Sequence, residues 1–273
     1  MHNWPGVPRR LAISAGLVAL ALSAAACGGS QGGATVQGVK LVSKGALTTC
    51  THLPYPPFQS EQGGKVVGFD VDLIDLVAKK LGVTQKIIDT PFETIKTGSA
   101  LNAGKCDVAA AGMTINAARA KFIDFSMPYF NATQALMAKK GTGVTSLDDV
   151  KAKKLKVGSQ ASTTGEDYVH SKGLDSTSFK DSTSELNGLR GGQVDVIVAD
   201  YPVVQEWLKD PVNSSKFELV ANLNTGEQYG FAVRKGYNPK LVALINQVID
   251  ESKKDGTYKS IYEKWIGPMP AGA

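Results

Sequence analysis

Histidine is scarce in this chain of 273 residues, and its scarcity excludes several kinds of chemistry. The three histidines, His2, His52 and His170, lie far apart, and none stands at the spacing from a cysteine or another histidine that a zinc site needs. No G-x-G-x-x-G dinucleotide loop occurs either. The segment GSALNAGK at 98–105 resembles a phosphate loop, but five residues separate its glycines and Cys106 replaces the usual Ser or Thr. We therefore expect neither a metal nor a cofactor, and the pattern favours binding without chemistry.

Long hydrophobic runs are also missing, except near the N-terminus. Residues 11–22 form an apolar run that is too short, and has the wrong flanks, for a membrane-spanning helix. Arg9 and Arg10 precede this run and small residues follow it, which is the order found in an export signal. We therefore predict that residues 1–26 are a secretory signal and that the mature domain has no spanning helix.

The end of the predicted signal and the residue after it form LSAAAC, residues 22–27. This segment resembles a bacterial lipobox, although Ala24 stands where leucine is commonest. The resemblance implies that Cys27 is acylated and becomes the mature N-terminus. Residues 27–39 are rich in glycine and would then form a flexible tether. We expect an extracytoplasmic protein with a lipid anchor at the outer face of the cell membrane. A plain signal peptide that is cut near Ala26 is the alternative.

The chain also lacks a strong charge of either sign. Lysine and arginine together number 30 against 25 acidic residues, which gives a formal net charge of +5. The lysines are spread along the chain, without a basic stripe interleaved with aromatic residues. Because nucleic-acid binding needs such a concentration of positive charge, we expect no nucleic-acid partner.

The few cysteines allow one disulfide bond. If Cys27 carries lipid, Cys50 and Cys106 remain as a pair in an oxidising compartment, where a bridge is expected. Cys50 falls at the end of a predicted strand and Cys106 at the start of another, and these opposite positions weigh against the bridge. Two buried free thiols are the alternative.

Apolar runs alternate with helical patterns along the rest of the chain, and this alternation predicts an α/β fold. Apolar residues recur at helical spacing over 70–81, and Gly82 follows as a stop signal. Three other helices have recognisable starts, because capping-box patterns begin at Ser146, Thr163 and Ser182. In the last of these, Glu185 is the predicted partner of the capping serine.

Two segments share one pattern and suggest two similar lobes. GKCDVAAAG at 104–112 and GQVDVIVAD at 192–200 both read as a buried strand that follows a helix. Open α/β sheets bind ligands outside the carboxyl ends of their strands. We therefore expect Gly112 and Asp200 to face each other across a cleft. A chance similarity between two hydrophobic strands is the alternative.

The first of these strands leads into AAGMTINAARAKFIDFSMPYF, residues 110–130, which carries groups suited to a carboxylate. Gly112 offers an exposed backbone carbonyl, Thr114 a hydroxyl and Arg119 a guanidinium near one strand end. The planar fork of arginine meets a carboxylate with two parallel hydrogen bonds. An ordinary surface arginine is the alternative if this residue stands alone.

Arg119 does not stand alone, because the other half of the chain adds complementary groups. In GSQASTTGEDY, residues 158–168, a helix begins at Thr163 and Thr164, and the N–H groups of a helix start attract anions. Asp200 ends the second of the two similar strands and suits an ammonium group. Together these residues predict a site for an α-amino acid zwitterion.

At these motifs the chain resembles the extracellular solute-binding proteins of family 3, the polar amino-acid receptors of ABC importers. The motifs extend from about residue 40 to 267 and are GFDVDLIDLVAKKLG, AAGMTINAARAKFIDFSMPYF, QVDVIVADYP, GEQYGFAVRKG and DGTYKSIYEKWIG. Their number and order make a chance match negligible.

The resemblance implies a type II periplasmic-binding-protein-like fold, a venus flytrap of two α/β lobes joined by two hinge strands. It places the hinge strands near 135–138 and 229–233. Residues 40–134 and 233–273 would form lobe one, and residues 135–232 the hinge and lobe two.

The resemblance also implies a set of ligand contacts, in which an arginine clamps the carboxylate, an aspartate and a carbonyl hold the ammonium, and aromatic side chains form the walls. In this sequence these contacts fall on His52, Tyr55, Phe92, Gly112, Met113, Thr114, Arg119, Gln160, Thr163, Thr164 and Asp200. Of these residues, Arg119 is the clamp, aided by the three threonines, whereas Gly112 and Asp200 hold the ammonium. Tyr55 and Phe92 form the walls, and Gln160 stands where selectivity is often set.

His52 lies in the proline-rich segment CTHLPYPPFQ, residues 50–59, whose prolines predict a rigid loop after a strand. Many members of the family carry an aspartate at this position. Its absence favours a polar ligand without strong positive charge, such as glutamine, glutamate, aspartate or a cystine-like molecule. A histidine that only caps the strand end is the alternative.

The implied function is a monomeric receptor that closes on a free amino acid and delivers it to the membrane permease of an ABC transporter. Three alternatives use the same fold: an enzyme resembling cyclohexadienyl dehydratase, the sensor module of a receptor, and a structural lipoprotein. An enzyme would need a general acid in the cleft, and the sequence leaves Glu166, Asp167 and Glu185 open for that role. A sensor module would need a separate partner chain, and the charged cleft argues against a structural lipoprotein.

Overall fold

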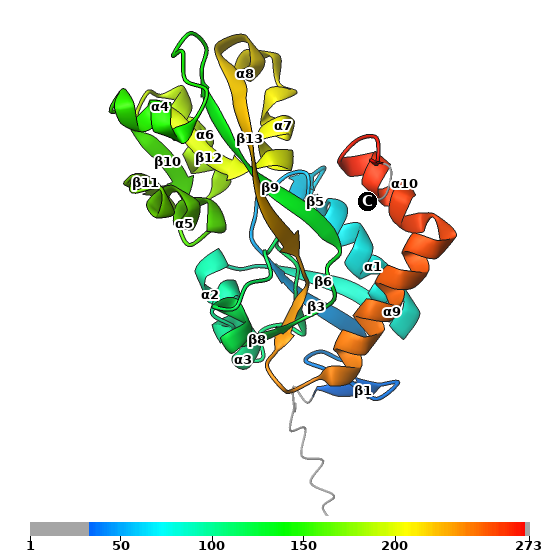
Figure 1. Ribbon diagram of the computed structural model, residues 1–273. Helices are drawn as coiled ribbons and strands as arrows, with labels where there is room; N and C mark the ends of the chain where they lie inside the picture. The colour runs from blue at the N-terminus through cyan, green and yellow to red at the C-terminus, as the bar shows by residue number, and fades with distance from the viewer. Residues whose placement is uncertain (1–32, 271–273) are drawn as a thin grey trace, which may run out of the picture. The chain divides into compact units, whose positions relative to one another are not determined.

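The computed structural model describes residues 33–270 of the chain (Figure 1). The predicted signal, residues 1–26, and the predicted acylation site Cys27 lie outside the described residues, as do residues 28–32 of the predicted tether. The described part of that tether is not all loop, because residues 34–36 form a strand that pairs with residues 39–41. Within residues 33–270, no helix is both long enough and apolar enough to cross a bilayer.

The first of two five-stranded sheets has the strand order β6-β3-β7-β14-β8. Strand β3 runs parallel to β6 and β7, whereas β14 runs antiparallel to β7 and β8. Its strands are β3 (Ala46–Thr51), β6 (Thr84–Asp89), β7 (Val108–Ala109), β8 (Ile123–Phe125) and β14 (Ala232–Arg234). We call this sheet and its helices lobe one.

The helices of lobe one pack on both sides of its sheet (Figure 1). One side carries α1 (Phe69–Leu81), α9 (Pro239–Asp255) and α10 (Thr257–Trp265), and the other carries α2 (Phe92–Lys96) and α3 (Ser99–Asn102). Because successive residues of a strand point to opposite faces, Leu47 packs with the first group and Cys50 with the second. Short pieces complete the lobe: β1 (Ala34–Val36), β2 (Val39–Leu41), β4 (Ser60–Gln62), β5 (Lys65–Val67) and the 3₁₀ turn η1 (Arg119–Lys121).

The second sheet has the order β11-β10-β12-β9-β13 and forms lobe two with five helices. Strand β10 runs parallel to β11 and β12, whereas β9 runs antiparallel to β12 and β13. The strands are β9 (Phe130–Lys139), β10 (Val157–Gln160), β11 (Ser176–Phe179), β12 (Val196–Asp200) and β13 (Phe217–Tyr229). The helices are α4 (Leu147–Ala152), α5 (Thr164–Ser171), α6 (Ser182–Arg190), α7 (Tyr201–Leu208) and α8 (Pro211–Lys216).

Two long strands, β9 and β13, join the lobes (Figure 1). They pair from Phe130 with Tyr229 at the lobe-one end to Lys139 with Phe217 at the other. The expected hinge at 135–138 lies inside the lobe-two sheet, because Ala135 to Ala138 pair with β12. The chain therefore crosses between the lobes slightly earlier, at 130–134, beside residues 223–229 of β13.

The two similar strand segments occupy equivalent places in the two lobes. Strand β7 lies parallel to β3 with Thr49 opposite Val108, and β12 lies parallel to β10 with Val157 opposite Val196. The first segment forms only a two-residue strand, Val108–Ala109. Past their carboxyl ends the two strands lead to Gly112 and Asp200, as the repeat predicted.

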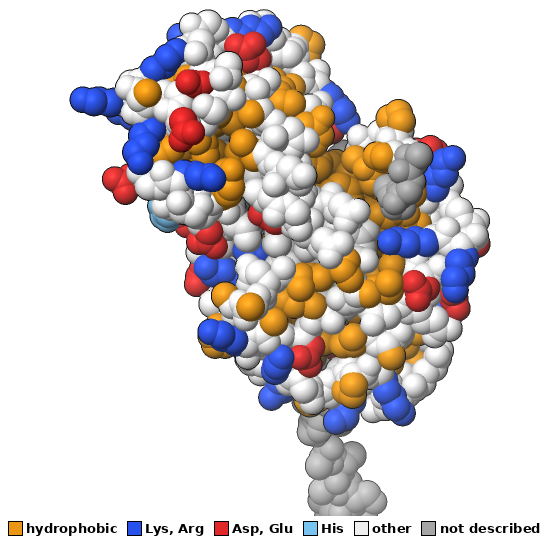
Figure 2. All heavy atoms as spheres, in the orientation of Figure 1, with side chains coloured by type: hydrophobic (Ala, Val, Ile, Leu, Met, Phe, Trp, Pro, Cys, Tyr) orange, Lys and Arg blue, Asp and Glu red, His pale blue; other side chains and the backbone are white. Residues whose placement is uncertain are grey.

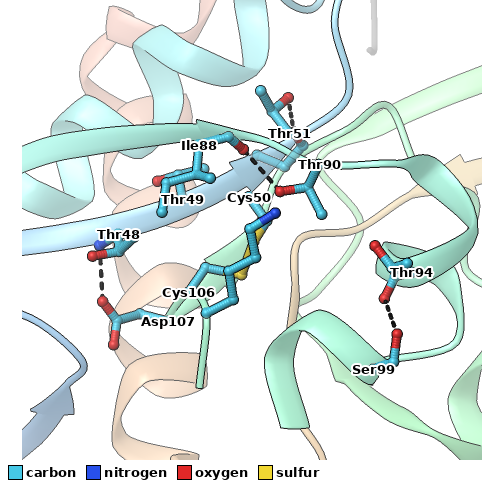
Figure 3. The surroundings of a disulfide bond; sticks show 12 residues. Thr48, Thr49, Cys50, Thr51, Ile88, Thr90, Thr94, Ser99, Cys106 and Asp107 are labelled. Atoms are coloured by element: carbon cyan, nitrogen blue, oxygen red, sulfur yellow. Dashed lines mark hydrogen bonds between the residues drawn. A yellow bond between two sulfur atoms is a disulfide. The ribbon is translucent and has the colours of Figure 1, made fainter. Parts of the chain in front are cut away.

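The predicted disulfide between Cys50 and Cys106 is present, with the two Cα atoms 5.7 Å apart (Figure 3). Cys106 precedes β7, and the next residue, Asp107, connects the segment before β7 to β3 and to the residue after β2 by hydrogen bonds. The Asp107 carboxylate accepts hydrogen bonds from the backbone N–H groups of Thr48, at 2.8 Å, and Val42, at 2.7 Å. Residues 106–107 therefore lie alongside β3, and the two cysteines are close despite their separation in sequence.

Charged side chains of both signs are interspersed over the face of the molecule in Figure 2. No continuous basic stripe crosses that face. This distribution agrees with the absence of a basic pattern in the sequence.

Candidate functional site

A pocket of about 340 Å³ lies between the two lobes and collects most of the predicted ligand contacts. The lining residues are His52, Tyr55, Phe92, Ala111, Gly112, Thr114, Arg119, Gln160, Thr163, Thr164 and Asp200. Each predicted contact except Met113 is in this set, and Ala111 is an addition.

Met113 lies outside the pocket, because its side chain is buried in the apolar cluster around Cys50 and Ile95. Only its backbone faces the hinge, where the carbonyl accepts a hydrogen bond from the N–H of Gly230 at 3.1 Å. The side chain of the next residue, Thr114, lines the pocket instead.

The proline-rich loop forms one wall of the pocket. Tyr55 and Phe58 stack with ring centroids 6.1 Å apart, and Phe58 is fully buried beneath the loop. His52 also faces the pocket, and neither of its buried ring nitrogens has a hydrogen-bond partner within residues 33–270. The loop is thus held by aromatic packing and presents Tyr55 and His52.

Gly112 brings its backbone close to Tyr55, and its conformation requires glycine. Its φ is +54°, and a Cβ at this position would lie 3.1 Å from a ring carbon of Tyr55. The N–H of Gly112 donates to Asp70 at 2.8 Å, and the hydroxyl of Tyr129 donates to the other oxygen of Asp70 at 2.7 Å. Burial raises the pKa of Asp70 to about 7, although these two hydrogen bonds oppose that rise.

Arg119 is a buried cation without an acidic partner. Its side chain is 6% exposed and forms no ion pair within residues 33–270. The guanidinium donates to the carbonyls of Thr114, at 3.0 Å, and Ser162, at 3.4 Å, and lies 5.3 Å from the ring centroid of Phe92. Burial lowers its pKa. Because a buried charge is costly unless it is paired, this guanidinium is suited to receive an anion.

Asp200 is the matching buried acid on the lobe-two side. It accepts hydrogen bonds from the hydroxyl of Tyr55 at 2.5 Å, from Gln134 at 2.5 Å, and from the hydroxyl of Tyr229. Burial and, next, the charge of Glu227 raise the pKa of Asp200 to about 6. No lysine or arginine within residues 33–270 forms an ion pair with it. The carboxylate is therefore suited to receive a cation.

Helix α5 points its first turn at the pocket, as the capping pattern predicted. The Thr163 hydroxyl accepts the N–H of Glu166 at 3.3 Å, and the Glu166 carboxylate accepts the N–H of Ser162 at 2.7 Å. The N–H groups of a first helical turn lack intrahelical partners. Since Thr163 and Thr164 line the pocket, this helix start adds partial positive charge on the lobe-two side.

Direct hydrogen bonds join the lobes around the pocket. The hydroxyl of Ser182, in lobe two, donates to the carbonyl of Pro54, in lobe one, at 2.7 Å. The Tyr55 hydroxyl of lobe one reaches Asp200 of lobe two. The described structure is therefore a closed arrangement of the two lobes.

Glu227, on the second hinge strand, contributes to the site and was missed from the sequence. One of its carboxylate oxygens accepts hydrogen bonds from the hydroxyls of Thr114 and Thr164, both at 2.9 Å. Each hydroxyl has one proton, so these donations leave both oxygens as acceptors. Glu227 lies in GEQYGFAVRKG, one of the motifs on which the family resemblance rests, but the resemblance gave this residue no role.

Glu185 was expected to complete a capping box with Ser182, and this prediction is wrong. Asp181 caps α6 instead, because its carboxylate accepts the N–H of Ser184 at 2.7 Å. Glu185 is consequently free of the helix end and is buried beside Asp200, where it lines a small cavity next to the pocket.

Within residues 33–270, no group of three or more His, Cys, Asp or Glu side chains could hold a metal ion.

Comparison with known proteins gives one family. Residues 47–268 match the bacterial extracellular solute-binding proteins, family 3. The putative ABC transporter arginine-binding protein 2 of Escherichia coli K12 is 33% identical over 243 residues, which are 85% of this chain and 96% of that protein.

Solved structures of binding proteins have the same fold. An ancestral arginine-binding protein bound to arginine has a TM-score of 0.75 and 41% identity, over 82% of this chain and 99% of that one, and its glutamine-bound form matches equally. AncCDT-1, an ancestral amino acid-binding protein and a precursor of cyclohexadienyl dehydratase, has a TM-score of 0.74 and 34% identity, over 81% and 96%. The resemblance and the two-lobe fold expected from the motifs are confirmed, and the chain belongs to family 3 of the bacterial extracellular solute-binding proteins.

Proposed function

We propose that this protein captures a free α-amino acid between its lobes and presents it to the permease of an ABC importer. The observation that carries the proposal is that the pocket contains both a buried cation, Arg119, and a buried acid, Asp200. Neither has a counter-ion in the described residues. An amino acid zwitterion supplies both missing partners at once. Arg119 and the start of α5 would hold the carboxylate, and Asp200 with the Gly112 carbonyl would hold the ammonium.

Closure follows from the way the site is divided. Lobe one supplies Arg119 and Gly112, and lobe two supplies Asp200 and the start of α5, so only the closed lobes satisfy the whole ligand. A ligand shifts an equilibrium by its difference in affinity for the two states, and here that difference favours closure. The permease would then distinguish the loaded protein by its closed form.

We propose, further, that the ligand has a positively charged side chain. The expectation of a ligand without strong positive charge relied on His52 alone. Three carboxyl groups, Glu185, Asp200 and Glu227, lie at or beside the pocket, against the single guanidinium of Arg119 among the lining residues. A zwitterion adds no net charge and leaves this acidic excess, whereas a cationic amino acid reduces it. The arginine-binding relative and the arginine-bound structure support this choice, although the same ancestral protein also binds glutamine.

A thermal-shift panel of the twenty amino acids tests this proposal. A ligand that binds only the folded state stabilises it, by about 2.7 kcal/mol at a ligand concentration of a hundred times Kd. This stabilisation raises the midpoint temperature of unfolding. We expect L-arginine, L-lysine or L-histidine to give the largest rise. A panel in which no amino acid raises the midpoint would contradict the proposed function, and a largest rise with an acidic amino acid would contradict the cationic ligand.

We propose a binding protein rather than an enzyme. The similarity to AncCDT-1 and the buried Glu185 make a general acid in the cleft the second candidate. Prephenate, however, has two carboxylates and no ammonium, so it would leave Asp200 unpaired and place a second anion near Glu185 and Glu227. We expect no product from prephenate or from arogenate, and turnover of either would favour the enzyme.

The remaining parts of the proposal concern the placement of the protein. Solute-binding proteins of this family are extracellular. We propose that residues 1–26 direct export, that acylated Cys27 anchors a monomer through a tether that ends before the strand Ala34–Val36, and that the lobes are 40–134 with 233–273 and 135–232. The hinge would bend near residues 130–134, where β9 leaves lobe one.

A further inference from the structure

Glu185 of α6 is a deeply buried acid that the zwitterion contacts leave unused. It is 1% exposed, and its buried Oε1 atom has no hydrogen-bond partner within residues 33–270. It forms no ion pair with a lysine or arginine of that range either. Because a buried carboxyl without a partner is costly and rare, its position calls for a ligand.

The cavity that Glu185 lines is next to the main pocket. It is small and shares Tyr55, Gln160, Thr163 and Asp200 with the pocket wall. A molecule held by Arg119 and Asp200 would therefore have this cavity within reach of its side chain. Gln160, the position expected to set selectivity, lies where the two spaces meet.

The polar atoms left without partners in the cavity are acceptors. Besides Glu185 Oε1, the Oε1 atom of Gln134 is buried without a hydrogen bond, whereas the Gln134 amide nitrogen donates to Asp200. A water molecule could satisfy these two oxygens while Glu185 stays protonated, but it could not compensate the charge of the ionised carboxylate. A group with several N–H donors and a positive charge matches both the hydrogen-bonding need and the charge.

We propose that this cavity receives the side chain of the bound amino acid and that the Glu185 carboxylate pairs with its guanidinium or ammonium group. The inference rests on the proposed function and names the residue that would select a cationic ligand. Burial and, next, the charge of Asp200 raise the pKa of Glu185 well above its ordinary value, so a neutral ligand would leave this acid protonated. A cation in the cavity restores the charged form through an ion pair.

Isothermal titration calorimetry with matched ligands tests the inference. L-arginine and L-citrulline have side chains of the same length and similar shape, but only arginine is charged. L-lysine and L-norleucine form a second pair, in which norleucine lacks only the charged terminal nitrogen. We expect the wild-type protein to prefer the charged member of a pair. Glu185→Gln should lower the affinity for that member by about 30-fold or more, the loss typical of a buried charge left unpaired, with little change for the neutral member.

Two controls separate the role of Glu185 from a general effect. Glu218→Gln removes one acid from the exposed surface of lobe two and should keep the preference for the charged ligand. The unfolding midpoint of Glu185→Gln should not fall, because glutamine has the same shape and carries no buried charge. A midpoint at or above that of the wild type shows that the loss of affinity is not a loss of folding.

The outcomes distinguish this inference from the proposed function. If Glu185→Gln keeps the preference of the wild type for arginine or lysine, the role of Glu185 is refuted, and the zwitterion site stands. If the wild-type protein binds the charged and neutral members equally, the cavity does not select charge and the inference is again refuted. If the protein binds none of the twenty amino acids, the proposed function itself fails.

Discussion

Asp70, at the start of α1, does not line the pocket but contacts a residue that does. It fixes the peptide of Gly112 and is held in turn by the Tyr129 hydroxyl. Gly112 then lies against Tyr55, at a φ of +54°. The sequence predicted Gly112 and Tyr55 as site residues but gave no sign of Asp70, because a pattern along the chain does not show which acid is buried under which peptide.

The burial of Asp70 should make the stability of the protein depend on pH. Its pKa is raised from 3.8 to about 7 by burial, so the folded state retains a proton that the unfolded state releases. The contribution of Asp70 is therefore fully present below the unfolded pKa and is lost as the pH rises through the folded one. Relative to the wild type, Asp70→Asn should gain up to about 1.4 kcal/mol of unfolding free energy per pH unit between roughly pH 4 and 7.

Urea unfolding of both proteins between these pH values measures this difference. Asp107 and Asp200 also have raised pKa values, so the wild-type curve alone does not isolate Asp70. The difference between the two proteins does. Parallel stability curves for wild type and Asp70→Asn would show that Asp70 is not held in its protonated form.

Among the elements, the helix starts show where sequence patterns succeed and where they fail. The capping residues predicted at Ser146 and Thr163 are correct, because each hydroxyl accepts a backbone N–H of the first turn. At α6 the prediction was off by one residue, because Asp181 takes the capping position predicted for Ser182. This shift by one residue turns Glu185 from a capping partner into a buried acid, which no local pattern reveals.

A pair of capping variants tests the part that α5 plays in binding. Thr163→Ala and Ser146→Ala each remove one N-cap hydrogen bond and should each lower the unfolding free energy by about 1 kcal/mol. Ser146 caps α4, outside the pocket, so its variant should bind L-arginine as the wild type does. Thr163→Ala should bind more weakly, because the helix start that faces the carboxylate would fray.

Chemical denaturation and calorimetry of these two variants provide the measurements. Equal losses of stability with a loss of affinity only in Thr163→Ala would support the assignment. Equal losses of stability without any change in affinity would remove the start of α5 from the carboxylate site.

For the whole molecule, the repeat and the motifs predicted the two lobes and the facing of Gly112 and Asp200, whereas the cysteine count predicted the disulfide. The hinge was placed a few residues late, because the apolar run 135–138 reads the same whether it spans the hinge or belongs to a sheet. Gln134 and Glu227 were missed because they reach the site only when the two hinge strands pair. The acidic balance of the pocket, and with it the ligand class, depends on such long-range neighbours.

The closed lobes also explain why the proposed ligand must satisfy two buried charges together. Arg119 belongs to lobe one and Asp200 to lobe two, and each has only neutral partners in the described residues. A ligand that lacks either the carboxylate or the ammonium would leave one buried charge without a partner, at a cost of several kcal/mol.

Calorimetry with L-arginine and two truncated analogues tests this central claim most directly. Agmatine lacks the carboxylate, and 5-guanidinopentanoate lacks the ammonium. We predict that the wild-type protein binds arginine about 30-fold or more tightly than either analogue, that Arg119→Ala removes the preference over agmatine, and that Asp200→Asn removes the preference over 5-guanidinopentanoate. Undiminished binding of arginine by Arg119→Ala or Asp200→Asn, or equal binding of all three molecules by the wild type, would contradict the account.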